Sequence, residues 1–175
     1  MASSKANARK APPAAPAPEE VARAVFAAIA GKELDRIVPY LHDDVVDDFV
    51  AVGTFRGPAE IRGFFDEIFR AFPDFELEVL RIVADDRAAA VQWRARGTFT
   101  GAPFQGIQAT GRRVEIPGAD VMEIEDGRIR HNTIYYDGAS FARAVGLLPR
   151  RDSAVDRGML SSFNAVTRLR SKLRG

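Results

Sequence analysis

The sequence contains no cysteine among its 175 residues. This absence excludes disulfides, thiol nucleophiles and cysteine-bound metals or clusters, although it leaves the redox compartment undetermined. No apolar run approaches the roughly 20 residues that a membrane-spanning helix needs, and the N-terminal residues have no apolar signal core. We therefore expect a cytoplasmic protein without a membrane span.

Several common functional motifs are also missing. The chain has neither a glycine-rich phosphate loop nor a Gly-x-Ser-x-Gly nucleophile motif. Only two histidines are present, and His42 stands beside acidic residues at 43, 44, 47 and 48. One histidine among exposed acids is more typical of a solvated turn than of a metal site, so we predict no metal.

Charge is distributed unevenly. Residues 1–18 contain three basic side chains and no acidic one, residues 150–175 contain seven basic and two acidic ones, and residues 19–149 carry the remaining net charge of −7. The proline- and alanine-rich segment 1–18 is typical of a disordered arm. Residues 19–149 are expected to form one domain.

The segment 150–175 predicts a basic amphipathic helix. Its apolar residues fall at helical spacing: Met159, Leu160, Phe163, Val166, Leu169 and Leu173. We expect this helix to contact the acidic body or a second subunit, with pocket closure and anionic lipid as alternatives. Its basic residues lack interleaved aromatic residues, so nucleic-acid binding is disfavoured.

The periodicity of apolar residues changes from helical to alternating along the chain. Helical spacing predicts helices over 19–30 and 33–41, and a third helix after Gly57-Pro58. Alternation predicts a short extended segment over 45–52 and long strands at 75–79, 88–100, 112–125 and 128–137. We therefore predict an α+β fold: a cone-shaped, curved antiparallel sheet covered by three N-terminal helices, with an extra C-terminal helix.

One carboxylate interrupts the apolar face of the strand 112–125. Asp120 alternates with Ile116, Gly118, Met122 and Ile124. Burying a charge without a partner costs several kcal/mol or shifts its pKa. Asp120 is therefore the first candidate for a functional residue.

The dipeptide Asp126-Gly127 predicts a tight hairpin that supplies neighbours for Asp120. If these are the two loop residues, counting back places Asp120 opposite Thr133. The residues expected on the same inward face are His131, Tyr135 and Asp137.

This inward cluster suits proton transfer. A carboxylate in an apolar cavity has a raised pKa, a nearby His131 can hold or relay its proton, and the Tyr135 hydroxyl can donate to an enolate oxygen. The alternative is a satisfied polar cluster that only fixes the hairpin register. Tyr135 could also be ordinary core, and Asp137 a helix cap.

Aromatic residues indicate an apolar ligand cavity beside this cluster. The candidates for its lining are Trp93, Phe49, Phe65, Phe69 and Phe104. Asp48 is a candidate for the pocket mouth. Each aromatic residue could equally serve core packing.

The chain resembles the SnoaL-like polyketide cyclase and ester cyclase branch of the nuclear transport factor 2-like superfamily over roughly residues 19–149. Besides the order of elements, the resemblance rests on five sequence features: the Ala109-Thr110-Gly111-Arg112 run, the Asp120 strand, the run from Asp126 to Ile129, Asp137, and the Val145 to Leu148 ending. It implies a general acid/base role for Asp120 in an intramolecular aldol closure, with no metal or organic cofactor. The chain departs from the branch at His131 and Thr133, where a Glu and a Trp are frequent.

The related limonene-epoxide-hydrolase-like enzymes use an Arg-x-Asp pair and a second aspartate. Here the corresponding residues are Arg94-Ala95-Arg96 and Ile134, which disfavours epoxide hydrolysis. The sequence thus favours a cyclase or isomerase acting on an enolisable apolar molecule, polycyclic ones included, in a homodimer. The alternative is a ligand-binding or assembly module without turnover. A cavity that reaches Asp120, with His131 within hydrogen-bond distance, would separate the two.

Overall fold

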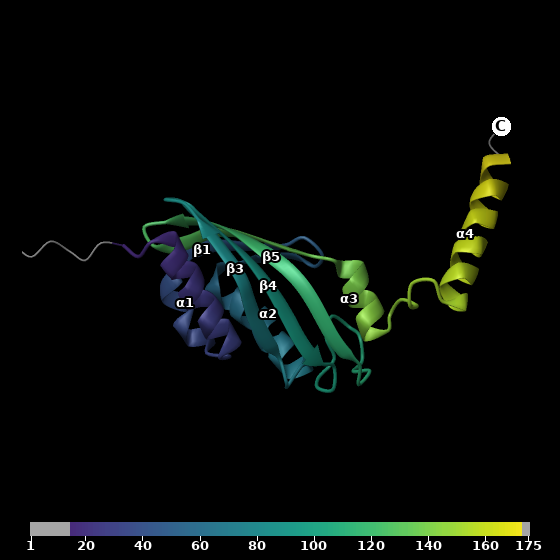
Figure 1. Ribbon diagram of the computed structural model, residues 1–175, viewed down its shortest axis with the longest axis horizontal. Helices are drawn as coiled ribbons and strands as arrows, with labels where there is room; N and C mark the ends of the chain where they lie inside the picture. Colours follow the sequence, from purple (N-terminus) through teal and green to yellow (C-terminus); the bar gives the residue numbers. More distant parts are fainter. Residues whose placement is uncertain (1–14, 173–175) are drawn as a thin grey trace, which may run out of the picture.

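The computed structural model describes residues 15–172 and contains four α-helices, two 3-10 turns and six strands (Figure 1). The helices are α1 (Pro18–Ala30), α2 (Gly57–Ala71), α3 (Gly138–Val145) and α4 (Ala154–Lys172). The strands are β1 (Leu41–Phe49), β2 (Gly53–Arg56), β3 (Glu76–Ala84), β4 (Ala88–Thr98), β5 (Arg113–Glu125) and β6 (Arg128–Tyr136).

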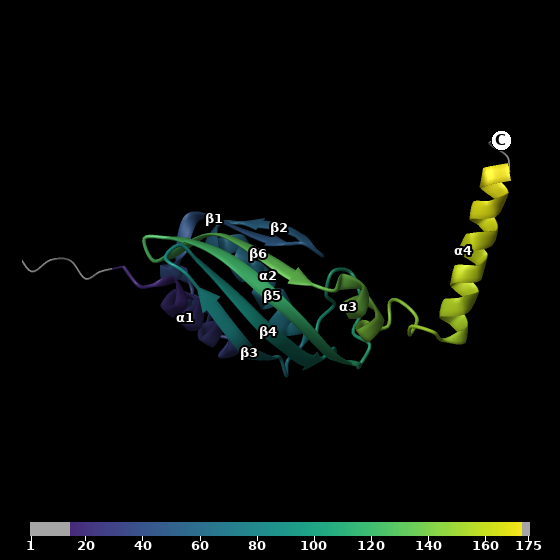
Figure 2. The ribbon, with the colours of Figure 1, turned by 45° about the horizontal axis from the view of Figure 1, so that its top comes forward.

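The six strands form one curved sheet in the order β2-β1-β6-β5-β4-β3, and Figure 2 shows β6, β5, β4 and β3 in turn from top to bottom. All neighbours are antiparallel except β1 and β6, which run parallel. The expected α+β fold with a curved sheet is therefore confirmed, whereas the wholly antiparallel sheet is wrong at one pair. The expected extended segment 45–52 is in fact the end of β1 and the turn that leads into β2.

The predicted helix over 33–41 is also corrected. The segment forms two 3-10 turns, Leu34–Arg36 and Val38–Tyr40, and Leu41 already begins β1. Pro39 supplies no backbone N–H, and the bond it removes is one that a continuous α-helix needs. Leu34 and Ile37 nevertheless face the core, as the helical spacing predicted.

Helices cover one face of the sheet. α1 packs on β3 and β4, α2 packs on β1 and β2, and α3 packs on β5 at the end of the sheet (Figure 1). Pro58 begins α2 in its first turn, where a missing N–H costs nothing. The space between the helices and the sheet contains the apolar core and the candidate site.

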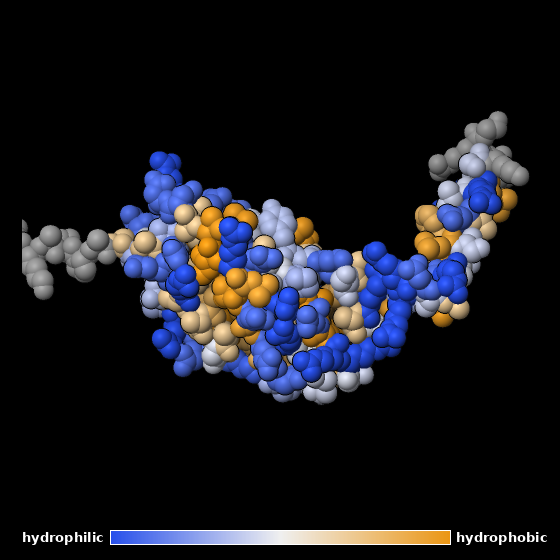
Figure 3. All heavy atoms as spheres, viewed as in Figure 1, coloured by the Kyte–Doolittle hydropathy of each residue, from blue (hydrophilic) through white to orange (hydrophobic). Residues whose placement is uncertain are grey.

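Within residues 15–172, no helix covers the opposite face of the sheet, which we call the open face, and α4 lies away from the body. Figures 1 and 2 show α4 away from the body, joined to α3 by a connecting segment. Its apolar side chains are exposed, Val155 at 70% and Phe163 at 67%, and apolar patches are visible on α4 and over β3 and β4 in Figure 3. The predicted C-terminal helix is confirmed; none of the helices within residues 15–172 is long and apolar enough to cross a membrane.

Candidate active site

The Asp126-Gly127 turn forms as predicted, with both residues in the left-handed region (φ 49° and 73°) that a two-residue hairpin requires. Glu125 pairs with Arg128 and Ile124 with Ile129. The next pair, however, joins Glu123 to His131, because the register shifts at this point and leaves Arg130 as an extra residue on β6. Asp120 therefore lies opposite Ile134, and the predicted pairing with Thr133 is wrong.

This one-residue bulge reverses the facing of the rest of β6. Tyr135 is 51% exposed, and the side chain of His131 is 39% exposed, with its Nδ1 3.8 Å from Glu123 Oε1. Neither residue lines the cavity, so the predicted inward cluster does not form. The inward residues are instead Asn132, Ile134 and Tyr136.

Two further predicted acids also lie away from the cavity. Asp137 is the N-cap of α3, where its Oδ1 accepts from the backbone N–H groups of Ala139 (2.9 Å) and Ser140 (3.0 Å). These bonds, with the Ser140 hydroxyl as the largest cause, lower the pKa of Asp137. Asp48 accepts from Thr54 Oγ1 at 3.1 Å, on the opposite side of β1 from the cavity.

Asp120 is buried as predicted, with 7% of its surface exposed. Both of its carboxylate oxygens accept a hydrogen bond: Oδ1 from Trp93 Nε1 at 2.7 Å and Oδ2 from Asn132 Nδ2 at 2.9 Å. Burial raises the pKa of Asp120 to about 6, while the bonds from Asn132 and Trp93 limit the rise because they favour the charged form. Asp120 is therefore a carboxyl group that titrates close to neutral pH.

Gly118 makes room for the tryptophan that holds Asp120. Gly118 and Trp93 are paired on β5 and β4, and a Cβ at position 118 would lie 2.3 Å from Trp93 Cζ2. The indole ring thus occupies the space that any other residue's side chain would need. The sequence predicts only an apolar wall at Trp93, but the indole N–H is also a donor to the carboxylate.

A second buried carboxyl group, Asp47, was missed. It is 5% exposed and pairs across the parallel strands β1 and β6 with Asn132. Burial and the negative charge of Asp120 raise the pKa of Asp47 to about 8, against a hydrogen bond from Asn132 that lowers it. The sequence contained a signal for it, because Asp47 alternates with the apolar residues Val45 and Phe49, and all three are buried in the structure.

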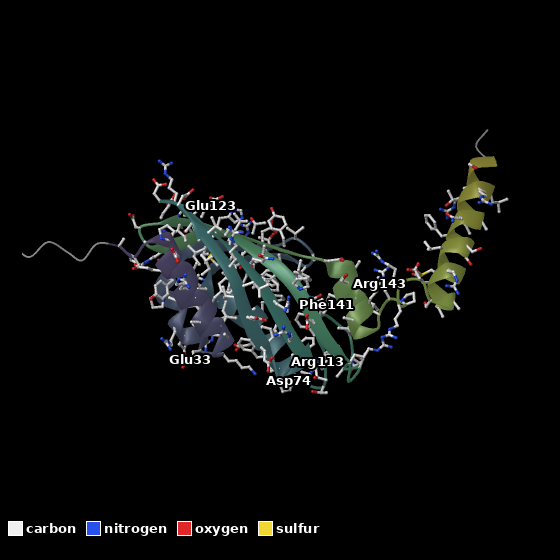
Figure 4. All side chains as sticks on the ribbon, in the orientation of Figure 1. Glu33, Asp74, Arg113, Glu123, Phe141 and Arg143 are labelled. Atoms are coloured by element: carbon white, nitrogen blue, oxygen red, sulfur yellow. The ribbon has the colours of Figure 1, made fainter. Side chains whose placement is uncertain are left out.

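The carboxyl groups of Asp47 and Asp120 line an apolar cavity of about 150 Å³. Of the predicted aromatic residues, Trp93, Phe49, Phe65 and Phe104 line it. Phe69 does not, and packs instead between Phe65 and Phe75. Phe141 of α3, which contacts Phe104 and Tyr136, lines the cavity from the end of the sheet opposite Glu123 (Figure 4).

Between residues 15 and 172, no group of three or more acidic or histidine side chains is placed to hold a metal ion. The chemistry that the site offers is acid/base chemistry. Both carboxyl groups are buried, and their raised pKa values of about 6 for Asp120 and about 8 for Asp47 suit a base and an acid that act near neutral pH.

Solved structures of other proteins share this fold. A proposed SnoaL-like polyketide cyclase from Jannaschia sp. CCS1 superimposes with a TM-score of 0.69 at 19% identity, over 81% of this chain and 99% of its own. IdmH, a proposed polyketide cyclase from Streptomyces antibioticus, gives 0.63 at 24% identity, over 74% and 98%. AclR, a proposed hydroxylase from Streptomyces galilaeus, gives 0.65 at 23% identity, over 75% and 96%.

A search of curated proteins finds no match. The model of the SnoaL-like polyketide cyclase family matches residues 19–145, which include every strand and both carboxyl groups of the site. The chain therefore belongs to the SnoaL-like polyketide cyclase family.

Proposed function

We propose that this protein is a cofactor-independent enzyme that moves a proton at an activated carbon of a small apolar molecule. The reaction is a polyketide-type cyclisation by intramolecular aldol closure, or an isomerisation, with Asp120 as general acid/base. One observation carries the proposal: the carboxyl groups of Asp47 and Asp120 share one apolar cavity, and their raised pKa values are about 8 and about 6. Family membership supports a small-molecule enzyme of this kind.

The two carboxyl groups take different roles because their environments separate their pKa values. Near pH 7 Asp120 is mostly ionised and can accept a proton, while Asp47 is mostly protonated and can donate a hydrogen bond. The bonds from Trp93 and Asn132 hold the Asp120 carboxylate in one orientation. The base is thus preorganised beside a neutral acid.

In the proposed reaction, the proton that Asp120 removes from the substrate is returned to the same molecule. The Asp120 carboxylate removes a proton from a carbon next to a carbonyl group, and the electron pair of the C–H bond forms an enolate that the Asp47 O–H stabilises. In a cyclisation, the enolate carbon forms a C–C bond to a second carbonyl carbon of the same molecule. The alkoxide produced there takes the proton back from Asp120. In an isomerisation, the proton returns to a different carbon of the enolate.

Deuterium exchange tests this proposal without knowledge of the natural substrate. Acetophenone, a ring-sized ketone with an enolisable methyl group, is incubated with the protein in D₂O, and loss of the methyl proton signal is followed by NMR. We expect catalysed exchange by the wild type and a decrease of about 10²-fold or more in Asp120→Asn, in which the amide cannot act as a base.

The matched control is Asp48→Asn, which makes the same change on the other side of β1 and should exchange at the wild-type rate. No exchange above buffer, or equal exchange by wild type and Asp120→Asn, would contradict the proposal and favour a ligand-binding module without turnover. Epoxide hydrolysis has less support, since Ile134 lies opposite Asp120 and the Arg96 guanidinium is paired with Glu115 and Glu78.

We also propose that the protein is a homodimer through the open face of the sheet. The apolar side chains exposed there include Val83, Val121 and Tyr135. A rigid and partly apolar sheet face is suited to pairing with its own copy. The cytoplasmic location expected from the sequence stays a prediction.

A further inference from the structure

The side-chain amide of Asn132 is only half satisfied. Its Nδ2 donates to Asp120, but its Oδ1 has no hydrogen-bond partner among residues 15–172, although Asn132 is 95% buried, with an exposed fraction of 5%. Buried polar atoms are almost always hydrogen-bonded, and an unpartnered one needs an explanation. Because Asn132 also lines the cavity, a ligand is the natural source of the missing donor.

The charges around the cavity restrict the ligand further. Asp47 and Asp120 are its acidic lining residues, and Arg96 is the only basic lining residue within the described part of the chain. The guanidinium group of Arg96 is already paired, with Glu115 at 3.0 Å and Glu78 at 3.1 Å. An anionic ligand would therefore lose its hydration beside a carboxylate without gaining a free cation.

The size of the cavity sets a third limit. A volume of about 150 Å³ is similar to that of an apolar protein cavity that holds one benzene ring. The walls are almost entirely aliphatic and aromatic, so the part of the ligand within the cavity is an apolar ring with few polar groups.

We propose that the site selects neutral, ring-sized carbonyl compounds that also carry a hydroxyl or N–H group, and that Asn132 Oδ1 accepts the hydrogen bond of that group. The carbonyl group in this description rests on the proposed function. The neutral charge, the ring size and the donor rest on the cavity and on Asn132 alone. Asn132 is thus a specificity-determining residue as well as a donor to Asp120.

One internal arrangement competes with a ligand for this oxygen. Asp47 and Asn132 are paired on adjacent strands, so a protonated Asp47 could donate to Asn132 Oδ1. In that case the amide would be satisfied in the free protein, and a donor on the ligand would bring no gain. A comparison of ligands with and without the donor separates the two arrangements.

Binding is measured by tryptophan fluorescence. Trp93 is the only tryptophan in the chain and contacts Asp120 inside the cavity, so its emission should respond to a bound ligand. The probes are acetophenone, 3-hydroxyacetophenone and 3-acetylbenzoate, which share one ring and one ketone but differ in the donor and the charge. We expect 3-hydroxyacetophenone to bind about tenfold more tightly than acetophenone, and 3-acetylbenzoate to bind at least tenfold more weakly than acetophenone.

Asn132→Leu, which has a similar shape but no acceptor, should bind the two neutral ketones equally. Thr133→Val, on the opposite face of the same strand, should keep the tenfold preference. Equal affinities in the wild type, a preference that persists in Asn132→Leu, binding of the anion as tight as that of acetophenone, or no binding of either neutral ketone would each overturn the inference. The wild-type panel alone decides the matter if the Leu variant does not fold.

These outcomes are distinct from failure of the proposed function, because they are read from binding and not from exchange. A tenfold preference without deuterium exchange would support the ligand class and contradict the enzyme. Exchange without a preference would support the enzyme and overturn the role of Asn132.

Discussion

At the scale of single residues, the site depends on how differently two carboxyl groups are solvated. Asp47 and Asp120 have similar burial. Hydrogen bonds from Trp93 and Asn132 limit the rise in the pKa of Asp120, whereas the negative charge of Asp120 raises the pKa of Asp47 further. The proton is consequently held more strongly by Asp47. The pH range between the two pKa values is the range in which one base and one acid coexist.

The rate of acetophenone exchange should therefore follow a bell-shaped curve. It should rise as Asp120 ionises near pH 6 and fall as Asp47 loses its proton near pH 8. Asp47→Asn retains an N–H donor but does not titrate, so the alkaline limb should disappear while most of the rate at pH 7 remains. Asp47→Leu provides no donor and should lower the rate by about 10²-fold. Equal rates for the Asn and Leu variants would show that donation by Asp47 contributes nothing.

Asp47 should also make the fold sensitive to pH. Its pKa is raised in the folded state from 3.8 to about 8, so between these values the folded state keeps a proton that the unfolded state has released. Stability consequently falls as pH rises through this range. Asp47→Asn removes the free energy cost of keeping Asp47 protonated in the folded state. We therefore expect this variant to be more stable than the wild type at pH 8 by about 2 kcal/mol or more, which corresponds to a melting temperature about 4–8 °C higher.

Thermal unfolding of both proteins at pH 5 and pH 8 checks this expectation. The difference should shrink at pH 5, because keeping the proton on Asp47 in the folded chain costs less free energy as the pH approaches 3.8. Asp48→Asn, which is not in the cavity, serves as the control and should show no such trend. A stability difference that is the same at both pH values would contradict a raised pKa at Asp47.

At the scale of elements, Trp93 reaches Asp120 only because β5 has a glycine opposite it. Gly118→Ala would place a Cβ 2.3 Å from the indole ring and 2.8 Å from the backbone oxygen of Tyr135. We expect this change to displace Trp93, to cost about 1–3 kcal/mol of stability and to slow exchange. Loss of the indole donor should raise the pKa of Asp120 further, so the acid limb of the pH profile should move to higher pH.

Unfolding, Trp93 fluorescence and exchange together measure this effect. The matched control is Gly63→Ala on α2, where nothing lies within 4 Å of the added Cβ. That substitution should stabilise the protein by about 0.5–1 kcal/mol, because alanine is the better helix former. Unchanged fluorescence and exchange in Gly118→Ala would show that the glycine does not position the indole.

The hairpin also shows how far a sequence can predict this site. The turn type follows from Asp126-Gly127, and Asp120 is correctly placed inward by simple alternation on β5. The bulge at Arg130 is not marked by any special residue, yet it exchanges His131 and Tyr135 for Asn132 and Tyr136 in the cavity. The sequence contains one sign of it: Ile129 and Ile134 are both large and apolar but lie five positions apart, so in a regular strand they would face opposite sides of the sheet. Both are buried in the structure.

The acid in β1 was missed for a related reason. The run from Asp43 to Asp48 contains acids of both parities, so its composition indicates an exposed turn. Only the parallel pairing of β1 with β6, which a pattern of local alternation cannot predict, places Asp47 beside Asn132. Most elements could thus be predicted from local signals, whereas the partners of Asp120 depend on long-range register.

At the scale of the whole molecule, two apolar surfaces have no cover within the described chain. One is the open face of the sheet, where Val83 and Val121 lie in one row across β3, β4 and β5. The other is the apolar stripe of α4, which contains Val155, Met159 and Phe163. A helix of this length gains most of its stability from packing of such a stripe, and both surfaces are therefore candidates for contact with a second copy.

The sheet face is the better candidate for the proposed homodimer, because its strands are fixed by their neighbours before any partner binds. Light scattering should show a dimer for the wild type. Val121→Arg places a charge at the centre of the open face, and we expect its dissociation constant to rise by 100-fold or more, with little change in unfolding of the monomer because the side chain is already 43% exposed. Val155→Arg makes the same change on α4 and should remain dimeric. Dissociation by Val155→Arg but not by Val121→Arg would place the interface on α4, and a monomeric wild type would contradict the homodimer altogether.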